Sequence, residues 1–217
     1  MPTLPLVVDA SLAGLIWERV RRFVVPVIEV KEDDDRFEFG LCGTWRAYGI
    51  NPVLLFGKYG PGAHFSPHTD GNNVVDFNNR SLHTVIVYMN DCGDGGRTHM
   101  FTESHPLVKD DRGRLRFPPR AEHDSAEVVC GEALCFAQDL LHEGEPVGDS
   151  SEKRIIRTDV MYARDPPLCD DRAGRSAYAT YLEAQRLEGQ GRCLEAGRAY
   201  SRARRECPEL ARHLKFV

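Results

Sequence analysis

The sequence predicts a mainly β protein, a sandwich or barrel, with one helix before the strands and a helical segment after them. Between about residues 24 and 163, short apolar runs are bounded by Gly, Pro, Asn and Asp, a pattern typical of all-β sandwiches and barrels. The segments on either side instead carry apolar residues at helical spacing. The order of these patterns indicates a β core flanked by helices.

The first predicted element is a helix that begins at Asp9, a residue type that often caps helix N-termini. Its apolar residues recur every three or four positions: Leu12, Leu15, Ile16, Val20 and Phe23. Such spacing gives a helix one apolar face, so we expect this helix to pack on the outside of the core.

Five runs with turn-forming residues at both ends are predicted to be strands. They are Val53–Lys58, Leu82–Met89, Ala126–Val129, Ala133–Ala137 and Arg154–Tyr162. Between the second and third runs, Thr102–His123 is rich in Pro, Arg and Asp and is predicted to be a surface loop. Loops of this length are often functional.

The chain changes in character after Pro166-Pro167. Residues 170–217 carry 10 Lys and Arg against 7 Asp and Glu, whereas the preceding residues carry 18 against 26. We therefore predict two domains, a β-rich one over residues 1–166 and a helical appendage over residues 170–217.

Residues 177–210 of this appendage resemble a single tetratricopeptide repeat. The residues at the signature spacing are Ala184, Gly191, Ala196, Tyr200, Ala203 and Pro208, while Leu187 stands where a tyrosine is usual. One repeat cannot bury its own apolar face, so we expect it to pack on the core or on another chain. A generic helical hairpin and a site for a protein partner are both open interpretations.

Composition excludes several classes of protein. A net charge of −5 gives no basic surface for sequence-independent binding of nucleic acid, and no apolar run is long enough to span a bilayer. Seven scattered cysteines without a Cys-x-x-Cys pair argue against a disulfide framework or a zinc finger. The N-terminus lacks the features of a secretory signal, so we expect a cytoplasmic or nuclear protein that is not secreted.

The most informative motif is His68-Thr69-Asp70, which is the one His-x-Asp in the chain. On an extended segment, residues two apart point to the same face, so both side chains can reach one metal. A second histidine from a distant strand would complete a set of two imidazoles and one carboxylate, which suits non-haem Fe(II). His142 is the preferred candidate because it follows the predicted strand Ala133–Ala137. The alternative candidates are His64, His83, His99, His105 and His123.

Five blocks of the sequence, in order, resemble the prolyl 4-hydroxylase-like Fe(II)/2-oxoglutarate-dependent dioxygenases, over about residues 51–162. They are Tyr59–Gly71 with its Pro-His-x-Asp, Thr84–Asn90, Gly95–Phe101, which looks like the family's Gly-Gly-x-Thr-x-Phe turn, Gly131–Phe136 and His142–Val147. The resemblance implies a double-stranded β-helix (jelly-roll) core. It also implies an iron site at His68, Asp70 and His142, with 2-oxoglutarate and O₂ as co-substrates and ascorbate as a further candidate cofactor.

The resemblance also implies a basic residue that binds the distal carboxylate of 2-oxoglutarate, since a buried carboxylate needs a cation. Lys153, Arg154 and Arg157 are the candidates. On a strand, Lys153 and Arg157 share one face and Arg154 lies on the other. Lys153 is preferred because it falls where the family has its basic residue, and Arg157 remains open as the anchor or as a substrate contact. Tyr59 resembles the family tyrosine that contacts the same carboxylate.

The expected reaction is hydroxylation of a substrate C–H, with release of succinate and CO₂. A protein or peptide side chain, most commonly proline in this family, is the leading substrate. A nucleic-acid or small-molecule substrate is the alternative, for which a basic loop with Arg112, Arg114, Arg116 and Arg120 could grip phosphate. A third hypothesis is a catalytically silent β-helix that binds a protein partner through its C-terminal helices.

Overall fold

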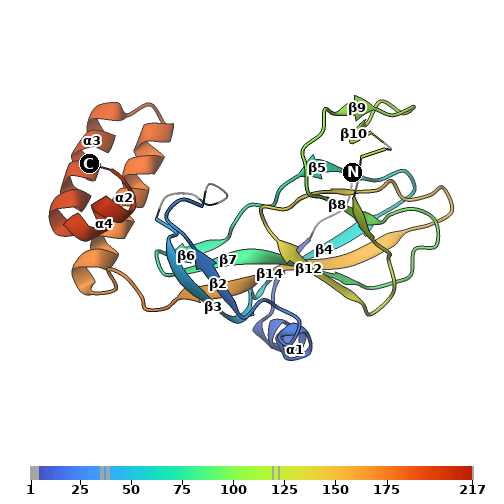
Figure 1. Cartoon of the computed structure of the whole chain (residues 1–217), viewed down its shortest axis with the longest axis horizontal. Coiled ribbons are helices and arrows are strands. Elements are labelled where there is room, and N and C mark those ends of the chain that lie inside the picture. Colours follow the sequence, from blue (N-terminus) through green and yellow to red (C-terminus); the bar gives the residue numbers. More distant parts are fainter. Residues whose placement is uncertain (1–4, 35–36, 38–39, 119, 122, 217) are drawn as a thin grey trace. The chain divides into compact units, whose positions relative to one another are not determined.

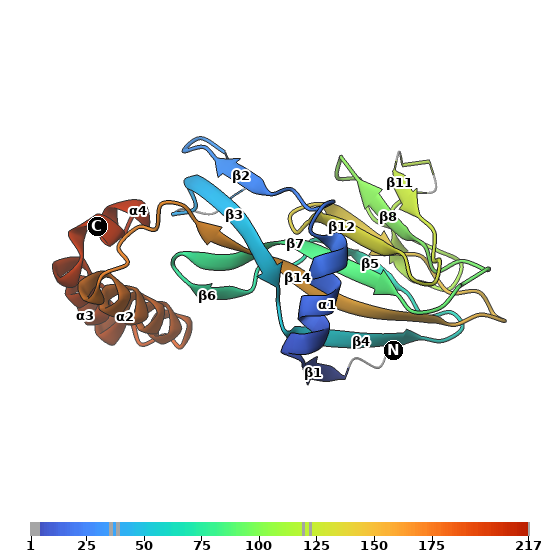
Figure 2. The same cartoon turned by 90° about the horizontal axis from the view of Figure 1, so that it is seen from below.

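The computed structural model describes residues 5–34, 37, 40–118, 120–121 and 123–216. Figures 1 and 2 show the helices and strands from two directions. The chain divides into two compact units. The first comprises Met1–Val24, Tyr48–Asn73 and Ser81–Met161, and the second comprises Val25–Ala47, Val74–Arg80 and Tyr162–Val217.

The first unit contains the predicted helix, α1 (Ala10–Val20). The Asp9 side chain caps it by accepting a hydrogen bond of 2.9 Å from the backbone N–H of Leu12, as its sequence position predicts. Its buried residues are Ala13, Ile16 and Val20. Leu15 and Phe23 were expected on the buried face but are 59% and 72% exposed, because the helix ends at Val20 and its buried stripe is narrow.

Two sheets make up the β core of the first unit. In the larger sheet, neighbouring strands follow the order β1 (Leu6–Val8), β4 (Val53–Tyr59), β14 (Lys153–Arg164), β7 (Asn79–Tyr88) and β12 (Ala133–Ala137), and β7 and β14 also run into the second unit. The smaller sheet has the order β11 (Asp124–Ala126), β8 (Thr98–Phe101), β13 (Leu141–Gly144) and β5 (Phe65–His68).

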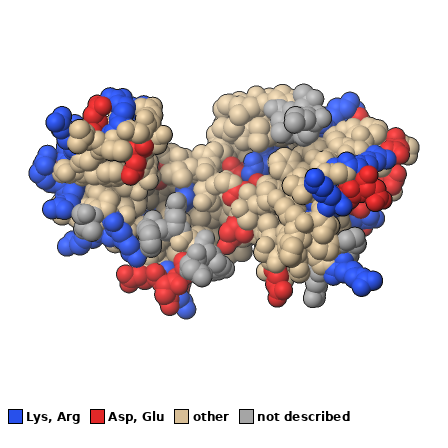
Figure 3. Space-filling view, turned by 90° about the horizontal axis from the view of Figure 1, so that it is seen from above, with Lys and Arg blue, Asp and Glu red and all other residues tan. Residues whose placement is uncertain are grey.

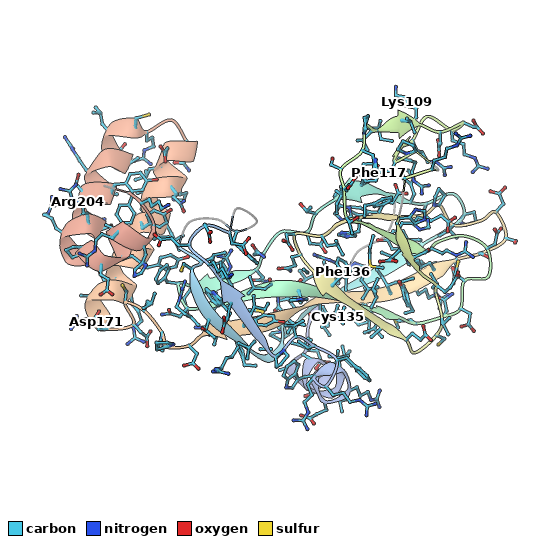
Figure 4. The ribbon with its side chains drawn as sticks, in the orientation of Figure 1. Lys109, Phe117, Cys135, Phe136, Asp171 and Arg204 are labelled. Atoms are coloured by element: carbon cyan, nitrogen blue, oxygen red, sulfur yellow. The ribbon has the colours of Figure 1, made fainter. Side chains whose placement is uncertain are left out.

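The chain alternates between the two sheets. It passes from β4 to β5, β7 and β8, and later from β11 to β12, β13 and β14. Each step leads to the other sheet, except that β8 and β11 lie in the same sheet. This winding is the double-stranded β-helix, or jelly-roll, and the predicted fold class is confirmed. Apolar side chains of the larger sheet, including Ile86, Phe136 and Ile155, fill the core, and Met100 of β8 in the smaller sheet packs against them. Phe136 is labelled on β12 in Figure 4.

The strand predictions are confirmed for four of the five runs, with small differences at their ends. The fifth, Ala126–Val129, is wrong, because the strand there is β11 (Asp124–Ala126) and the next three residues belong to no strand. The predicted loop Thr102–His123 also contains a hairpin of β9 (Val108–Lys109) and β10 (Leu115–Arg116). Phe117 holds this segment on the smaller sheet, since its ring lies 4.5 Å from that of Phe101.

In the second unit, β2 (Val27–Val30) pairs with β3 (Gly43–Ile50), and β6 (Val74–Asp76) pairs with the start of β7. The C-terminal segment is helical, as predicted: α2 (Arg172–Gly189), α3 (Cys193–Glu206) and α4 (Pro208–His213). Asp171 caps α2 through a hydrogen bond of 2.7 Å from the backbone N–H of Gly174. Gly191 adopts a φ of +73° in the turn between α2 and α3, a conformation that favours glycine.

The small residues expected between α2 and α3 are buried there. Ala184 and Ala196 belong to one apolar cluster with Leu187 and Ala199. A second cluster joins Ala177 and Leu210 to Phe77, which lies between β6 and β7. The second unit therefore includes strands as well as helices, and its limits differ from the predicted division between residues 166 and 170. The predicted helical domain and its likeness to a tetratricopeptide repeat stay predictions.

The surface of the helical segment carries the basic side chains that its composition predicts. Figure 3 shows Lys and Arg on this part of the molecule, and Figure 4 labels Arg204 on α3. Within the residues that the structure describes, no helix combines the length and the apolar character needed to cross a membrane.

Candidate metal centre and its pocket

Strand pairing brings the His-x-Asp motif to the distant histidine. β5 and β13 are antiparallel neighbours, and their register makes His68 and His142 direct partners, with ring centroids 4.2 Å apart. Asp70 follows β5 and lies between them. Its Oδ1 is 3.7 Å from His68 Nε2, and its Oδ2 is 3.7 Å from His142 Nε2. The candidate ligand atoms of these three residues all lie within 4.8 Å of one another.

Backbone carbonyls fix the orientation of both imidazole rings. His68 Nδ1 lies 2.8 Å from the carbonyl oxygen of Ser66, and His142 Nδ1 lies 2.9 Å from that of Leu140. A carbonyl oxygen only accepts hydrogen bonds, so each Nδ1 donates, and each Nε2, which faces Asp70, is the ring nitrogen left for a metal. Burial lowers the pKa of His142, which keeps its ring neutral, as a metal ligand must be.

Neighbouring donors hold both oxygens of the Asp70 carboxylate. Thr84 Oγ1 donates to Oδ2 at 2.6 Å, and the Arg157 guanidinium contacts Oδ1 at 2.8 Å. The side chain is 8% exposed. Two imidazoles and one oriented carboxylate beside an open pocket match the ligand set of non-haem Fe(II) sites, so these residues fit the metal that the sequence suggested.

The other histidines do not form a competing set. His64 lines the same pocket, but the cluster of potential ligands does not include it. His99 and His123 contact each other on the smaller sheet, with ring centroids 4.5 Å apart, and His99 Nδ1 pairs with the Ser125 hydroxyl at 3.0 Å. Across the described part of the chain, His68, Asp70 and His142 are the one group with a metal-like arrangement.

A pocket of about 180 Å³ extends from the three candidate ligands between the two sheets. Its lining comes mostly from β4, β5, β13 and β14, and consists of Leu55, Tyr59, His64, Phe65, His68, Asp70, Ile86, Thr98, His142, Gly144, Glu145, Val147, Lys153, Ile155 and Arg157. Apolar walls with a few charged groups are typical of sites for small ligands.

Lys153 is buried in this pocket, with 5% of its surface exposed. Its ammonium donates to the carbonyl oxygen of Gly96 at 2.7 Å and lies 3.5 Å from Thr98 Oγ1. No ion pair joins it to a carboxylate among the residues that the structure describes. Burial lowers its pKa from 10.5 to about 8. A buried cation without a carboxylate partner is costly, so the residues here fit an anionic group bound beside Lys153.

The alternation predicted for β14 is correct. Ile155 and Arg157 line the pocket with Lys153, whereas Arg154 lies on the other face, is exposed and pairs with Glu152. Arg157 already has carboxylate partners, since its guanidinium lies 2.8 Å from Asp70 and 3.9 Å from Asp159.

Tyr59 lies opposite Lys153 in the ladder between β4 and β14 and also lines the pocket. Burial raises the pKa of its hydroxyl, so the group stays protonated and able to donate a hydrogen bond near neutral pH.

The arginines of the β9–β10 segment are largely matched by acidic residues. Arg116 makes a bidentate pair with Glu143, at 2.6 and 2.9 Å. Arg114 pairs with Asp110 at 2.6 Å, and Arg112 lies 3.5 Å from Asp149. This neutralisation does not favour the basic loop as a grip for phosphate.

Comparison with protein families agrees with this geometry. Residues 54–159 match the sequence model of the 2OG-Fe(II) oxygenase superfamily. This match covers just under half of the chain and includes both histidines, Asp70, Lys153 and Arg157. It supports a 2-oxoglutarate-dependent dioxygenase.

Solved structures similar to this oxygenase include a prolyl-4-hydroxylase of Pseudomonas putida, 16% identical with a TM-score of 0.43, over 75% of this chain and 71% of that one. A cupin domain of Bordetella pertussis is 12% identical with a TM-score of 0.29, over 50% and 79% of the two chains. A 2OG-Fe(II) oxygenase family oxidoreductase of Burkholderia pseudomallei is 13% identical with a TM-score of 0.35, over 55% and 45%. Similarity at this level carries no argument about substrate. None of the curated proteins matches the sequence.

Three residues around the site of this oxygenase were not predicted to belong to it: Thr84, Gln138 and Asp159. Thr84 could have been noticed, because it begins a block already assigned to a strand and is a polar residue in an apolar run. Gln138 and Asp159 carry no comparable signal, since their role depends on contacts between distant strands.

Proposed function

We propose that the protein is an Fe(II)- and 2-oxoglutarate-dependent dioxygenase that hydroxylates a C–H on a protein side chain, such as that of proline, and releases succinate and CO₂. The single observation that carries this proposal is the continuous pocket that has the His68–Asp70–His142 cluster at one place and the buried Lys153 ammonium at another. A metal chelated by a keto acid and a cation for the far carboxylate are what 2-oxoglutarate requires.

In this proposal, His68 and His142 bind Fe(II) through their Nε2 atoms and Asp70 binds it through its carboxylate. The bound iron supplies the activation of O₂ that drives oxidation of 2-oxoglutarate and of the substrate. The protein holds both rings through backbone carbonyls and the carboxylate through Thr84 and Arg157, so the ligands are oriented before the metal arrives.

Lys153 is the proposed anchor for the distal carboxylate of 2-oxoglutarate, with Tyr59 as a second contact. The comparison with Arg157 supports this ranking. Lys153 is buried and donates only to a carbonyl and a hydroxyl, whereas Arg157 is engaged by Asp70. An incoming carboxylate would complete the environment of Lys153 but would have to compete with Asp70 for Arg157.

The substrate is proposed from the family alone, and a small molecule or a nucleic acid is the alternative. Paired arginines on β9–β10 make nucleic acid the weaker of the two. A silent β-helix that only binds a partner is less favoured, because a binding module needs neither three convergent ligands nor a buried unmatched ammonium. A cytoplasmic or nuclear location, stimulation by ascorbate and a partner for the C-terminal helices stay predictions.

The test is turnover. Purified protein with Fe(II) and ascorbate should convert 2-oxoglutarate to succinate, and His68→Ala should not. Incubation with a peptide library, followed by mass spectrometry, should reveal products heavier by one oxygen atom. Turnover that His68→Ala leaves intact would contradict the proposal, and turnover without oxidised peptides would direct the search to small molecules and nucleic acids.

A further inference from the structure

Gln138 lies in the turn after β12 and is almost completely buried, with 1% of its surface exposed. Its main chain makes two hydrogen bonds that bracket the candidate metal site. The N–H donates to the carbonyl oxygen of Leu82 on β7 at 3.0 Å, and the carbonyl oxygen accepts from the backbone N–H of Asp70 at 2.8 Å.

The side chain of Gln138 makes three more hydrogen bonds. Its Oε1 accepts from Asn72 Nδ2 at 2.8 Å and from the Ser81 hydroxyl at 3.0 Å. Its Nε2 donates to Asp159 Oδ1 at 3.0 Å. The amide therefore joins the segment after β5 to β7 and to β14.

We propose that Gln138 is a positioning residue that places the Asp70 carboxylate for metal binding. The inference rests on the proposed role of Asp70 as a metal ligand. Residues 69–73 belong to no strand, so no ladder fixes the position of Asp70. Gln138 substitutes for that ladder by holding the backbone of Asp70 and the side chain of Asn72, two residues further along.

A second route connects Gln138 to the same carboxylate. Asp159 accepts from Gln138 and from Asn51 Nδ2 at 3.2 Å, and it also lies 3.9 Å from the Arg157 guanidinium. Arg157 in turn contacts Asp70 at 2.8 Å. Gln138 thus acts on Asp70 through the backbone and through the pair Asp159–Arg157. Partners of this kind typically change metal affinity when they are removed.

The first experiment compares Gln138→Leu with Leu54→Ala. Leucine has a similar size but removes all three side-chain hydrogen bonds. Leu54 is fully buried on β4 away from the pocket lining, so Leu54→Ala lowers stability without touching the network. Each full-length protein is titrated with Co²⁺ alone and melted without metal. We expect Gln138→Leu to bind Co²⁺ about 10- to 100-fold more weakly, and Leu54→Ala to bind it as the wild type does.

The second experiment exchanges the two partners. Gln138→Glu places a carboxyl group against the carboxylate of Asp159. Asp159→Asn places an amide against the amide of Gln138, where the wild type has an accepting carboxylate. In the double variant the acceptor and donor are matched again with their positions reversed. We expect the double variant to bind Co²⁺ more tightly than either single variant, which a loss of packing alone would not produce.

The outcomes separate this inference from the function on which it rests. If the wild type binds no Co²⁺, the proposed metal site itself is wrong and the inference is overturned with it. If the wild type binds Co²⁺ and Gln138→Leu binds it equally well, the metal site stands and the positioning role is overturned. The positioning role is also overturned if the double variant fails to bind Co²⁺ more tightly than both single variants.

Discussion

Lys153 lies directly across the ladder from Tyr59, and its ammonium nitrogen is 5.8 Å from the centre of the Tyr59 ring. The centre of the Tyr88 ring lies 5.3 Å from the same nitrogen. Two aromatic rings and one backbone carbonyl thus surround a cation that has little water around it. This arrangement costs the folded protein stability, and the cost is understandable if the ammonium is kept for an anionic ligand.

Removal of the Lys153 ammonium should therefore weaken 2-oxoglutarate binding. We expect Lys153→Ala to raise the KM for 2-oxoglutarate by at least about ten-fold, the scale of one buried charge-assisted contact, and to change the KM for the other substrate little. Steady-state kinetics with each substrate varied in turn would measure this. Arg157→Ala is the comparison, and the reverse pattern, in which only this variant raises the KM for 2-oxoglutarate, would assign the anchor to Arg157.

The pH dependence follows from the lowered pKa of Lys153, about 8. Below that pH the ammonium is charged and can pair with a carboxylate, and above it the charge is lost. We expect kcat/KM for 2-oxoglutarate to fall above about pH 8, by about ten-fold for each further unit. Lys153→Arg provides a control, because a guanidinium keeps its proton in this range. A decline at the same pH in that variant would show that another group is responsible.

The same burial makes a prediction about stability. The folded-state pKa of Lys153 is about 8, below its ordinary 10.5, so the unfolded chain holds more protons between these values and stability rises with pH there. Below pH 8 the folded protein bears the cost of the buried charge. A variant without the ammonium avoids this cost but loses two hydrogen bonds, which offsets part of the gain in stability. We expect Lys153→Met to be more stable at pH 7, by on the order of 1 kcal/mol, with the difference shrinking toward pH 10. Urea unfolding at several pH values would test this, and a less stable variant at pH 7 would contradict it.

Sequence reasoning identified the long elements of the fold and missed the short ones. The run Ala133–Ala137 has apolar residues between clear turn signals, and its bounds agree with those of β12. By contrast, β5 and β13 are four residues each, and their polar and glycine residues carry little strand pattern. They exist because they pair with neighbours, and that information is not local. These two missed strands are the ones that carry His68 and His142.

The residues of the candidate site were predictable where they belong to family motifs. His68, Asp70 and His142 were named from their motifs, and the structure brings their ligand atoms together. Strand alternation correctly separated Arg154 from the pocket. It could not rank Lys153 against Arg157, because the two share a face and differ only in what surrounds them. The contact between Arg157 and Asp70 joins residues from distant parts of the chain, so no sequence pattern contains it.

The proposed metal site predicts one transition metal per chain. We expect His68→Ala to lose Fe(II) binding and 2-oxoglutarate turnover while the fold is retained, since His68 is partly exposed and contributes little to the core. Anaerobic metal titration, turnover and circular dichroism would measure the three effects. His99→Ala is a matched control, because His99 lies on the smaller sheet outside the ligand cluster. Full turnover in His68→Ala would refute the site.

The last prediction concerns the C-terminal helices. Leu210 of α4 is fully buried and belongs to the apolar cluster with Phe77 and Ala177, so the helices share a core with the strand-bearing part of their unit. We expect Leu210→Ala to lower the free energy of unfolding by about 2–5 kcal/mol, the usual cost of emptying a buried leucine site. Leu194 on α3 is 84% exposed, and Leu194→Ala should change it by less than about 0.5 kcal/mol. Chemical denaturation of both variants gives these values.

Truncation before Ser176 extends the test from one side chain to the whole segment. It removes Ala177 and Leu210, the two other buried members of the Phe77 cluster, so we expect a loss of about 2 kcal/mol or more, or an insoluble protein. The measurement is the melting temperature of the truncated protein beside that of the full chain, together with 2-oxoglutarate turnover. A truncated protein that stays soluble, melts like the full chain and keeps its turnover would show that the helices are an independent module. The search for their role should then turn to a protein partner, because the helices would contribute neither to stability nor to catalysis.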